Sequence, residues 1–160
     1  MPTAFTHNSP MLVYRISRTN FADDLSGEGA RLYGGRWNPK GIPCLYTAAS
    51  ISLAVLEFSV HVNIDELPRA LSIATLKIPD SFRDLALQDL PGDWNRWPSP
   101  ASTRDLGGKL LSAQKDLVIR VPSTVIPQEF NFLINPLHAQ IKQVKLLSVE
   151  DFVFDVRIKQ

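Results

Sequence analysis

The chain has 160 residues, of which 44% are hydrophobic and 21% charged, and this composition fits one globular domain with its own core. Its net charge is only +1, from 17 basic and 16 acidic residues, and the basic residues form no stripe, which argues against direct binding to nucleic acid. The single cysteine, Cys44, excludes an internal disulfide and a cysteine-rich zinc site.

The N-terminus and the hydropathy pattern give an expected location. No apolar run approaches the roughly 20 residues that would span a membrane. Residues 1–10 contain no basic stretch followed by an apolar one, so we expect no signal peptide and a cytoplasmic protein. We interpret these first residues as a loose tail, followed by one folded domain over residues 11–160.

The first part of the folded domain combines short strands with a glycine-rich segment. Its β-branched and aromatic residues predict a strand over residues 11–17 and a second one over residues 43–48. Between them, residues 20–41 contain five of the chain's eight glycines. This density indicates backbone that turns tightly or lies close to a ligand.

An apolar periodicity predicts a helix over residues 50–62, with Ser50 as its N-cap. Apolar side chains cover most of its circumference, and only a narrow strip that includes Ser59 is polar, so we expect a buried helix. Glu57 then falls on an apolar flank, with His61 one turn later.

The rest of the chain contributes more strands than helices. We predict strands at 71–78, 117–121 and 152–158, an ordered loop at 90–100, a turn at 135–136, and a helix at 102–113 that begins with a capping box from Ser102 to Asp105. The expected fold class is therefore α+β, with mixed sheets and few helices, and not a doubly wound parallel sheet.

Glu57 is the first candidate for chemistry, because a carboxylate on an apolar flank is costly unless it is paired or neutralised. One interpretation is an ordinary contact with His61, four residues later, or a partly exposed position. The other is a carboxylate held in a pocket, where it stabilises developing positive charge or handles a proton. The spacing alone leaves both open.

Two arginines are candidates for binding phosphate. Arg36 follows Gly34 and Gly35, a pair that lets the backbone approach a ligand, and a guanidinium can bind phosphate through two hydrogen bonds. A turn in which this arginine stacks on Trp37 is the alternative. Arg15 lies within the first strand, where facing water is the commoner case.

Tyr46 and Ser123 complete the candidates. Tyr46 lies in the second short strand and can equally belong to the core. Ser123 follows a strand end without the Gly-x-Ser-x-Gly elbow of a hydrolase nucleophile. The three histidines have no metal-ligand spacing, so we expect no metal site. Together these residues suggest a glycine-lined pocket with two arginines and one buried acid, suited to a ligand with phosphates and a leaving group of positive character.

The order of short segments along the chain resembles the RES domain family, which is named for an arginine, a glutamate and a serine. The resemblance runs from about residue 11 to residue 158. The matching pieces are Tyr14-Arg15, residues 25–31 (LSGEGAR), 34–38 (GGRWN), 45–48 (LYTA), Leu56-Glu57, 90–94 (LPGDW), 117–123 (LVIRVPS), 131–136 (NFLINP) and 154–157 (FDVR). So many pieces in a fixed order make the match specific.

This resemblance implies a compact single domain with a fold similar to the diphtheria-toxin-like ADP-ribosyltransferases. It also implies a toxin that arrests growth by depleting NAD⁺, which is its substrate, with no metal. An Xre-like antitoxin would neutralise it in a hetero-oligomeric complex in which the toxin can be a dimer. Any contact with DNA would then be made by the antitoxin.

The family's site residues also carry over onto this chain. The resemblance assigns Arg15, Glu57 and Ser123 to catalysis, and Arg36 and Tyr46, with Gly34 and Gly35 beside them, to binding of NAD⁺. In this interpretation the arginines hold the pyrophosphate, the tyrosine stacks on nicotinamide, and the glutamate stabilises an oxocarbenium-like transition state. The acceptor stays open. The alternatives are a NAD⁺ glycohydrolase or phosphorylase, an ADP-ribosyltransferase that modifies a protein, and a non-catalytic relative.

Overall fold

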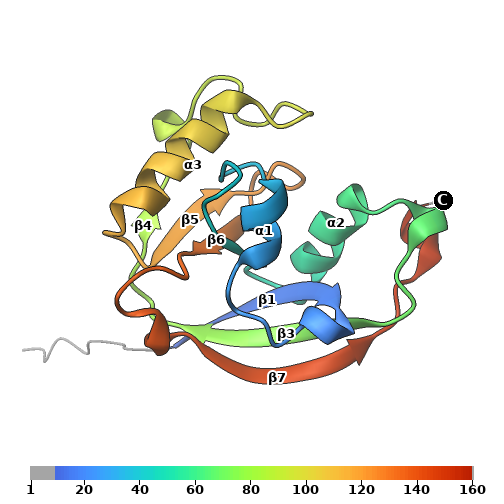
Figure 1. Ribbon diagram of the computed structural model, residues 1–160. Coiled ribbons are helices and arrows are strands. Elements are labelled where there is room, and N and C mark those ends of the chain that lie inside the picture. Colours follow the sequence, from blue (N-terminus) through green and yellow to red (C-terminus); the bar gives the residue numbers. More distant parts are fainter. Residues whose placement is uncertain (1–9, 160) are drawn as a thin grey trace, which may run out of the picture.

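The computed structural model describes residues 10–159, so the tail expected at residues 1–10 lies outside them except for Pro10. The described chain forms one mixed β-sheet of seven strands with three α-helices, which is the α+β class expected from the sequence (Figure 1). Over the same residues, no helix has both the length and the apolar character needed to cross a membrane.

The sheet has the strand order β4-β5-β6-β2-β1-β3-β7. Its strands are β1 Met11–Arg18, β2 Leu45–Ala48, β3 Leu71–Ile78, β4 Arg83–Asp84, β5 Val118–Pro122, β6 Phe130–Ile134 and β7 Lys145–Phe152. β4 and β5 are parallel, and the other neighbouring strands are antiparallel, so the sheet is mixed.

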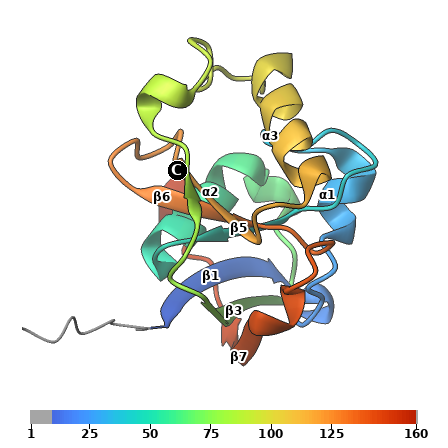
Figure 2. The ribbon, with the colours of Figure 1, turned by 90° about the vertical axis from the view of Figure 1, so that its left-hand side faces the viewer.

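The sheet divides at its centre, between β1 and β2. β1 pairs with β3 at eight successive positions, whereas its register with β2 holds a single described pair, Tyr14 opposite Ala48. The two halves, β4-β5-β6-β2 and β1-β3-β7, therefore diverge. In Figure 2, β1, β3 and β7 lie together at the bottom of the view, away from α3 at the top. Side chains of β1 and β2 can then face the space between the halves.

The three α-helices are α1 Glu28–Tyr33, α2 Ile51–His61 and α3 Ala101–Ala113. α2 begins at the predicted cap, since Ser50 Oγ accepts a hydrogen bond from the backbone N–H of Leu53 at 3.1 Å. Leu53 and Ala54 pack against β1 and β2, which places this helix at the split of the sheet. α3 packs against β5 and β6 through a separate apolar cluster that includes Leu111.

α2 is less buried than its apolar circumference predicts. Ile51 and Val60 are 43% and 50% exposed, so the expectation of a helix buried nearly all round is wrong. Ser59, expected on the polar strip, is instead buried, and its hydroxyl donates to the Leu56 carbonyl at 2.7 Å. The reason is that the helix packs on the sheet with one face only, and a serine can turn its polar group back onto its own backbone.

The capping box predicted for α3 is also wrong. The helix begins at Ala101, its N-cap residue is Pro100, and no side chain caps it. Ser102 Oγ instead donates to a carboxylate oxygen of Asp93. This serine therefore joins the helix to the preceding loop, a tertiary contact that competes with the local cap.

The last strand lies earlier in the chain than the sequence pattern predicts. β7 is Lys145–Phe152, and a 3₁₀ helix, Val156–Lys159, follows it in the described residues, so the strand expected at 152–158 is wrong. Pairing with β3 stops at Phe152. The alternation beyond it arises because Phe154 is buried against Phe58 of α2, with ring centroids 5.9 Å apart.

Gly107 lies inside α3, at a point where the helix packs directly on the backbone of the glycine-rich segment. A Cβ added there would lie 1.8 Å from the Trp37 carbonyl oxygen, a backbone atom that cannot turn away as a side chain can. We expect Gly107→Ala to lower the free energy of unfolding by about 3 kcal/mol, and the melting temperature by roughly 10 °C.

Gly29→Ala is the matched control, because Gly29 is also helical and a Cβ there meets nothing within 4 Å. This variant should melt at or above the wild-type temperature, since alanine favours helix over glycine. Thermal unfolding followed by circular dichroism measures both variants. A Gly107→Ala protein as stable as the wild type would contradict the direct helix-to-backbone packing.

Candidate active site

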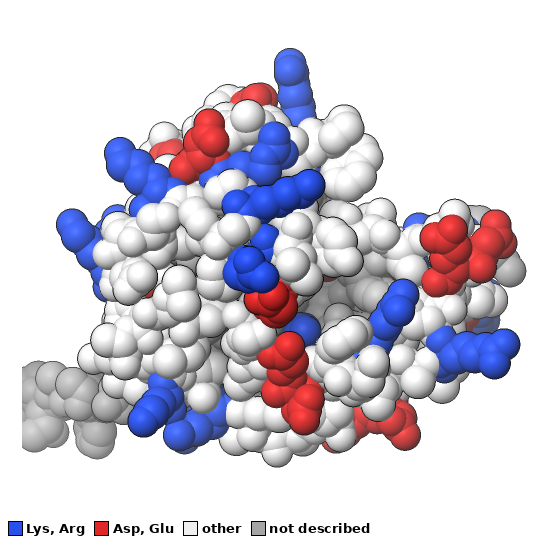
Figure 3. Space-filling view, viewed as in Figure 1, with Lys and Arg blue, Asp and Glu red and all other residues white. Residues whose placement is uncertain are grey.

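A pocket of about 620 Å³ opens at the split of the sheet. In Figure 3 this face of the molecule is hollowed near its centre, between α1 and α2. The lining combines residues of β1, α1 and the segment after it, β2, α2, the loop before α3, and the ends of β5 and β6. Segments that are far apart in the sequence therefore share one cavity.

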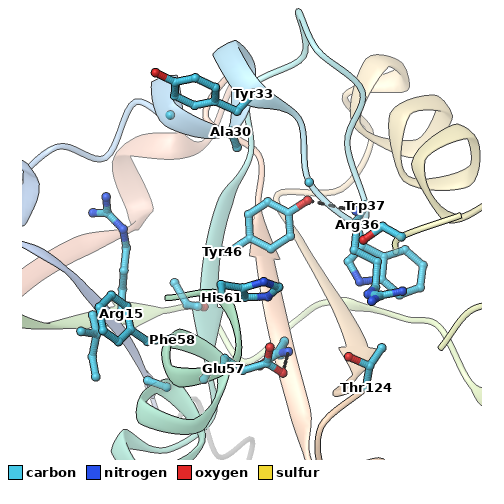
Figure 4. Close-up of a pocket in the computed structure, with 18 of the residues that line it drawn as sticks. Arg15, Ala30, Tyr33, Arg36, Trp37, Tyr46, Glu57, Phe58, His61 and Thr124 are labelled. Carbon is cyan, nitrogen blue, oxygen red and sulfur yellow. Dashed lines mark hydrogen bonds between the residues drawn. The ribbon is translucent and has the colours of Figure 1, made fainter. Parts of the chain in front are cut away.

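The structure brings together all seven positions that the sequence singles out. The six that line the pocket are Arg15, Gly34, Gly35, Arg36, Tyr46 and Glu57. The seventh, Ser123, is fully buried and lies behind Glu57, to which it is hydrogen-bonded. In the view of Figure 4, Arg15 and Arg36 lie on opposite sides of the pocket, with Tyr46 and Glu57 between them.

Two neutral donors hold the Glu57 carboxylate. Its Oε1 accepts hydrogen bonds from Ser123 Oγ at 2.6 Å and from Asn131 Nδ2 at 2.7 Å. The partners of this oxygen are therefore on β6 and just after β5, and not His61 in the next turn of α2. Because both bonds use Oε1, the second oxygen, Oε2, stays available to a ligand in the pocket.

The Ser123 hydroxyl has a fixed direction. Its oxygen accepts hydrogen bonds from the backbone N–H groups of Val125 and Ile126, each at 3.1 Å. The single hydroxyl proton is then directed to Glu57. Ser123 is thus a buried support for the carboxylate, and it does not itself line the pocket.

Arg15 reaches the pocket from β1. Its Nη1 donates to the carbonyl oxygens of Asp24 at 3.0 Å and Phe21 at 3.4 Å. Burial lowers the pKa of this guanidinium, and the nearby Asp24 carboxylate partly opposes that shift. An arginine stays charged despite such a shift, so a bound anion would compensate for the lost hydration.

Arg36 reaches the pocket from the glycine-rich segment. Its Nη1 donates to the carbonyl oxygens of Trp94 at 3.0 Å and Arg96 at 2.8 Å, so it fastens the loop before α3 to the pocket wall. Burial lowers its pKa, while Glu57 and Tyr46 act in the opposite direction. Within residues 10–159, neither Arg36 nor Arg15 forms an ion pair with an acidic side chain.

Tyr46 connects β2 to the glycine-rich segment. Its hydroxyl accepts a hydrogen bond from the backbone N–H of Trp37 at 3.0 Å and donates to Asn38 Oδ1 at 2.6 Å. Burial raises the pKa of this phenol, so it stays protonated and keeps its donor role. At Gly35 a Cβ would lie 2.6 Å from the Tyr46 hydroxyl, and glycine is therefore required for this close approach.

The pocket also contains residues that sequence reasoning missed as site residues. Asn131, His61 and Trp97 line it beside the predicted ones. The position of His61, one helical turn after Glu57, could have indicated that it belongs to the site. Asn131 reaches Glu57 because β6 pairs with β2, which no local pattern reveals. In the described range 10–159, no group of three or more His, Cys, Asp or Glu is arranged to hold a metal ion.

The described chain is thus an α+β domain whose split mixed sheet opens into a pocket that contains a fixed carboxylate and two arginines. A family model described as RES domain matches residues 12–155, and the chain belongs to this family. The family expected from the sequence is therefore confirmed.

Three relatives resemble the chain over nearly its whole length. It is 41% identical to "Toxin Res" from Yersinia enterocolitica over 153 residues, which cover 93% of this chain and 100% of that protein. It is 38% identical to "Toxin Res" from Photorhabdus laumondii over 92% of this chain and 97% of the relative. It is also 36% identical to "Prs ADP-ribosylating toxin" from Sphingobium sp., over 89% and 91% of the two chains.

A solved structure shares the fold. A chain in the crystal structure of the M. tuberculosis MbcT–MbcA toxin–antitoxin complex aligns with a TM-score of 0.75 and 22% sequence identity, over 90% of this chain and 85% of that one. The likeness covers nearly the whole described domain and supports the compact α+β fold expected from the sequence.

Proposed function

We propose that this chain is the toxin of a toxin–antitoxin pair and that it consumes NAD⁺ by cleaving the bond between nicotinamide and ribose. The observation that carries the proposal is the Glu57 carboxylate, held by Ser123 and Asn131 in a pocket with two arginines bound to backbone carbonyls. NAD⁺ has two phosphates and a cationic leaving group, and it matches these charges. The family and the names of the relatives support the same conclusion.

In the proposed reaction the electron pair of the glycosidic bond leaves with nicotinamide, whose pyridinium ring becomes neutral. Positive charge develops on the ribose ring, and an acceptor then bonds to the anomeric carbon and releases a proton. Glu57 stabilises this charge through Oε2, because a fixed anion acts more strongly in a site shielded from water. Ser123 and Asn131 position the carboxylate and do not touch the substrate.

The other predicted residues bind NAD⁺ in this proposal. Arg15 and Arg36 hold the pyrophosphate, which would offset the burial that lowers their pKa values. The Tyr46 ring packs against nicotinamide, since its hydroxyl is already bound to Asn38. Gly34 and Gly35 let the backbone lie close to the ligand. None of these steps involves a metal ion.

A second candidate differs only in the acceptor. One relative, from Sphingobium sp., is named an ADP-ribosylating toxin, and this favours transfer of ADP-ribose to a protein side chain. The same pocket, with Glu57 at its centre, would serve both reactions. Transfer to water or phosphate releases nicotinamide without labelling any protein, so the two candidates are separable.

The proposed partner is an Xre-like antitoxin, supported by the likeness to a chain from a toxin–antitoxin complex. The net charge of +1 supports contact with DNA through that partner, because a chain that binds DNA alone usually has a basic excess. We place the protein in the cytoplasm, where it would meet NAD⁺.

Incubation of the pure protein with NAD⁺ should release nicotinamide, and chromatography measures the amount released. The assay is run with water alone, with inorganic phosphate, and with cell extract and NAD⁺ labelled in its adenine, so that the acceptor is identified. Expression in growing cells should arrest growth, and an Xre-like antitoxin should restore it. A pure protein that leaves NAD⁺ intact under all three conditions would reject the enzymatic proposal.

A further inference from the structure

Two aromatic rings meet in the open part of the pocket. His61, at the end of α2, lies against Trp97, in the loop before α3, with ring centroids 5.5 Å apart and planes inclined by 53°. Both residues line the pocket, and Trp97 is 69% exposed. The pair thus joins two separate segments at the place where the pocket meets solvent.

This pair differs from the other aromatic pairs of the described chain. Phe132 and Phe154, which pack against Phe82 and Phe58, are 2% and 8% exposed and belong to the interior. Trp97 buries little of its ring against the protein. A large aromatic side chain that stays in water at the wall of a cavity offers apolar area that a bound ligand would bury.

The loop that carries Trp97 is bound to a charged group of the pocket. Arg36 donates to the carbonyl oxygen of Arg96, the residue directly before Trp97. On the other side, His61 lies one helical turn after Glu57. The rings are therefore neighbours of the guanidinium proposed to hold phosphate.

The setting of His61 favours the neutral form of its ring. Burial lowers its pKa, with a further lowering by Arg36 and Lys159, while Glu57 raises it. The net direction of the pKa shift is downward, which disfavours the charged imidazolium. The face of a neutral aromatic ring beside Trp97 is available for stacking.

We propose that His61 and Trp97 form the binding surface for the adenine ring of NAD⁺. This inference rests on the proposed function and names the part of the pocket that holds the non-reacting end of the substrate. In this proposal nicotinamide lies against Tyr46, with the breaking bond beside Glu57, and adenine lies against Trp97, whose exposed ring extends the pocket wall toward solvent. The pyrophosphate held by Arg36 joins these two ends of the dinucleotide.

Binding of ADP-ribose, which contains adenine and pyrophosphate but no nicotinamide, tests the proposal without any reaction. Isothermal titration calorimetry should show about tenfold weaker binding to Trp97→Ala, because stacking of a base on one aromatic ring contributes on this order. Trp97→Phe and His61→Phe should retain most of the affinity, since an aromatic ring remains. Val153→Ala, an exposed position outside the pocket lining, is the matched control and should bind as the wild type.

Nicotinamide mononucleotide separates the two ends of the substrate, because it lacks adenine. Its affinity should be the same for Trp97→Ala and the wild type. In turnover, Trp97→Ala should raise KM with kcat nearly unchanged, as expected when a contact is equal in ground state and transition state.

Three results would overturn the inference: wild-type protein that does not bind ADP-ribose, unchanged ADP-ribose affinity in Trp97→Ala, or an equal loss of both ligands in that variant. These outcomes are distinct from failure of the proposed function. Protein that binds ADP-ribose through Trp97 but releases no nicotinamide would keep the adenine surface and reject only the reaction.

Discussion

Replacement of Glu57 by glutamine should reduce the release of nicotinamide from NAD⁺ by roughly 100-fold or more while the protein stays folded. The glutamine carbonyl can accept the same hydrogen bonds from Ser123 and Asn131, so the local structure is kept. What is lost is the negative charge at Oε2. The effect should fall on kcat, since the positive charge on ribose develops only in the transition state.

The matched control is Glu66→Gln, because Glu66 is an exposed glutamate at the end of the 3₁₀ helix Ile64–Glu66 and does not line the pocket. It should cleave NAD⁺ at the wild-type rate. Circular dichroism and the melting temperature verify that Glu57→Gln is folded. Equal turnover by Glu57→Gln and the wild type would contradict a catalytic role of the carboxylate.

Elements with a strong local signal are the ones that the sequence predicts correctly. The cap at Ser50 is formed by atoms three residues apart, so the start of α2 is readable. β1 and β3 have β-branched, apolar sequences and are found at nearly the expected positions. β6, Phe130–Ile134, lies between β5 and β2, yet no strand is expected there from the sequence. Its polar Asn131 faces Glu57.

Where a local pattern competes with tertiary contacts, the sequence misleads. Ser102 has the spacing of a capping box but its hydroxyl donates to Asp93. Phe154 continues the alternation of β7 although it packs against Phe58 of α2. In both cases the pattern is real, and the partner that decides its meaning comes from elsewhere in the chain.

In the candidate site, too, residues with a local pattern are predictable and their partners from distant segments are not. Glu57 is predictable as a candidate because a carboxylate on an apolar helix flank is costly unless it is paired or functional. Arg36 is predictable as a candidate because two glycines precede it. Their partners are not predictable from spacing: Ser123 follows Glu57 by 66 positions and meets it only through the order of strands in the sheet. No pattern around Trp97 in the sequence predicts that it lines the pocket. Its loop is held there by a hydrogen bond from Arg36, a distant residue, to the carbonyl oxygen of Arg96.

Arg36→Ala should weaken the binding of ADP-ribose by roughly tenfold to 100-fold, because hydrogen bonds from a charged donor to phosphate are among the stronger polar contacts. The guanidinium is partly buried, and its hydrogen bonds go to the carbonyls of Trp94 and Arg96. A bound pyrophosphate would be its counter-ion. Arg157→Ala, which removes an exposed arginine paired with Asp155 outside the pocket lining, should bind as the wild type.

Adenosine distinguishes a phosphate contact from an indirect effect on the loop. It has no phosphate, so its binding should be unchanged in Arg36→Ala if the guanidinium acts on the pyrophosphate. A parallel loss of adenosine binding would mean that Arg36 acts by holding the loop with Trp97 in place, because its hydrogen bond to Arg96 is removed as well. Unchanged affinity for both ligands would reject Arg36 as a binding residue. Calorimetric titration of the two ligands against the wild type, Arg36→Ala and Arg157→Ala therefore decides between these roles.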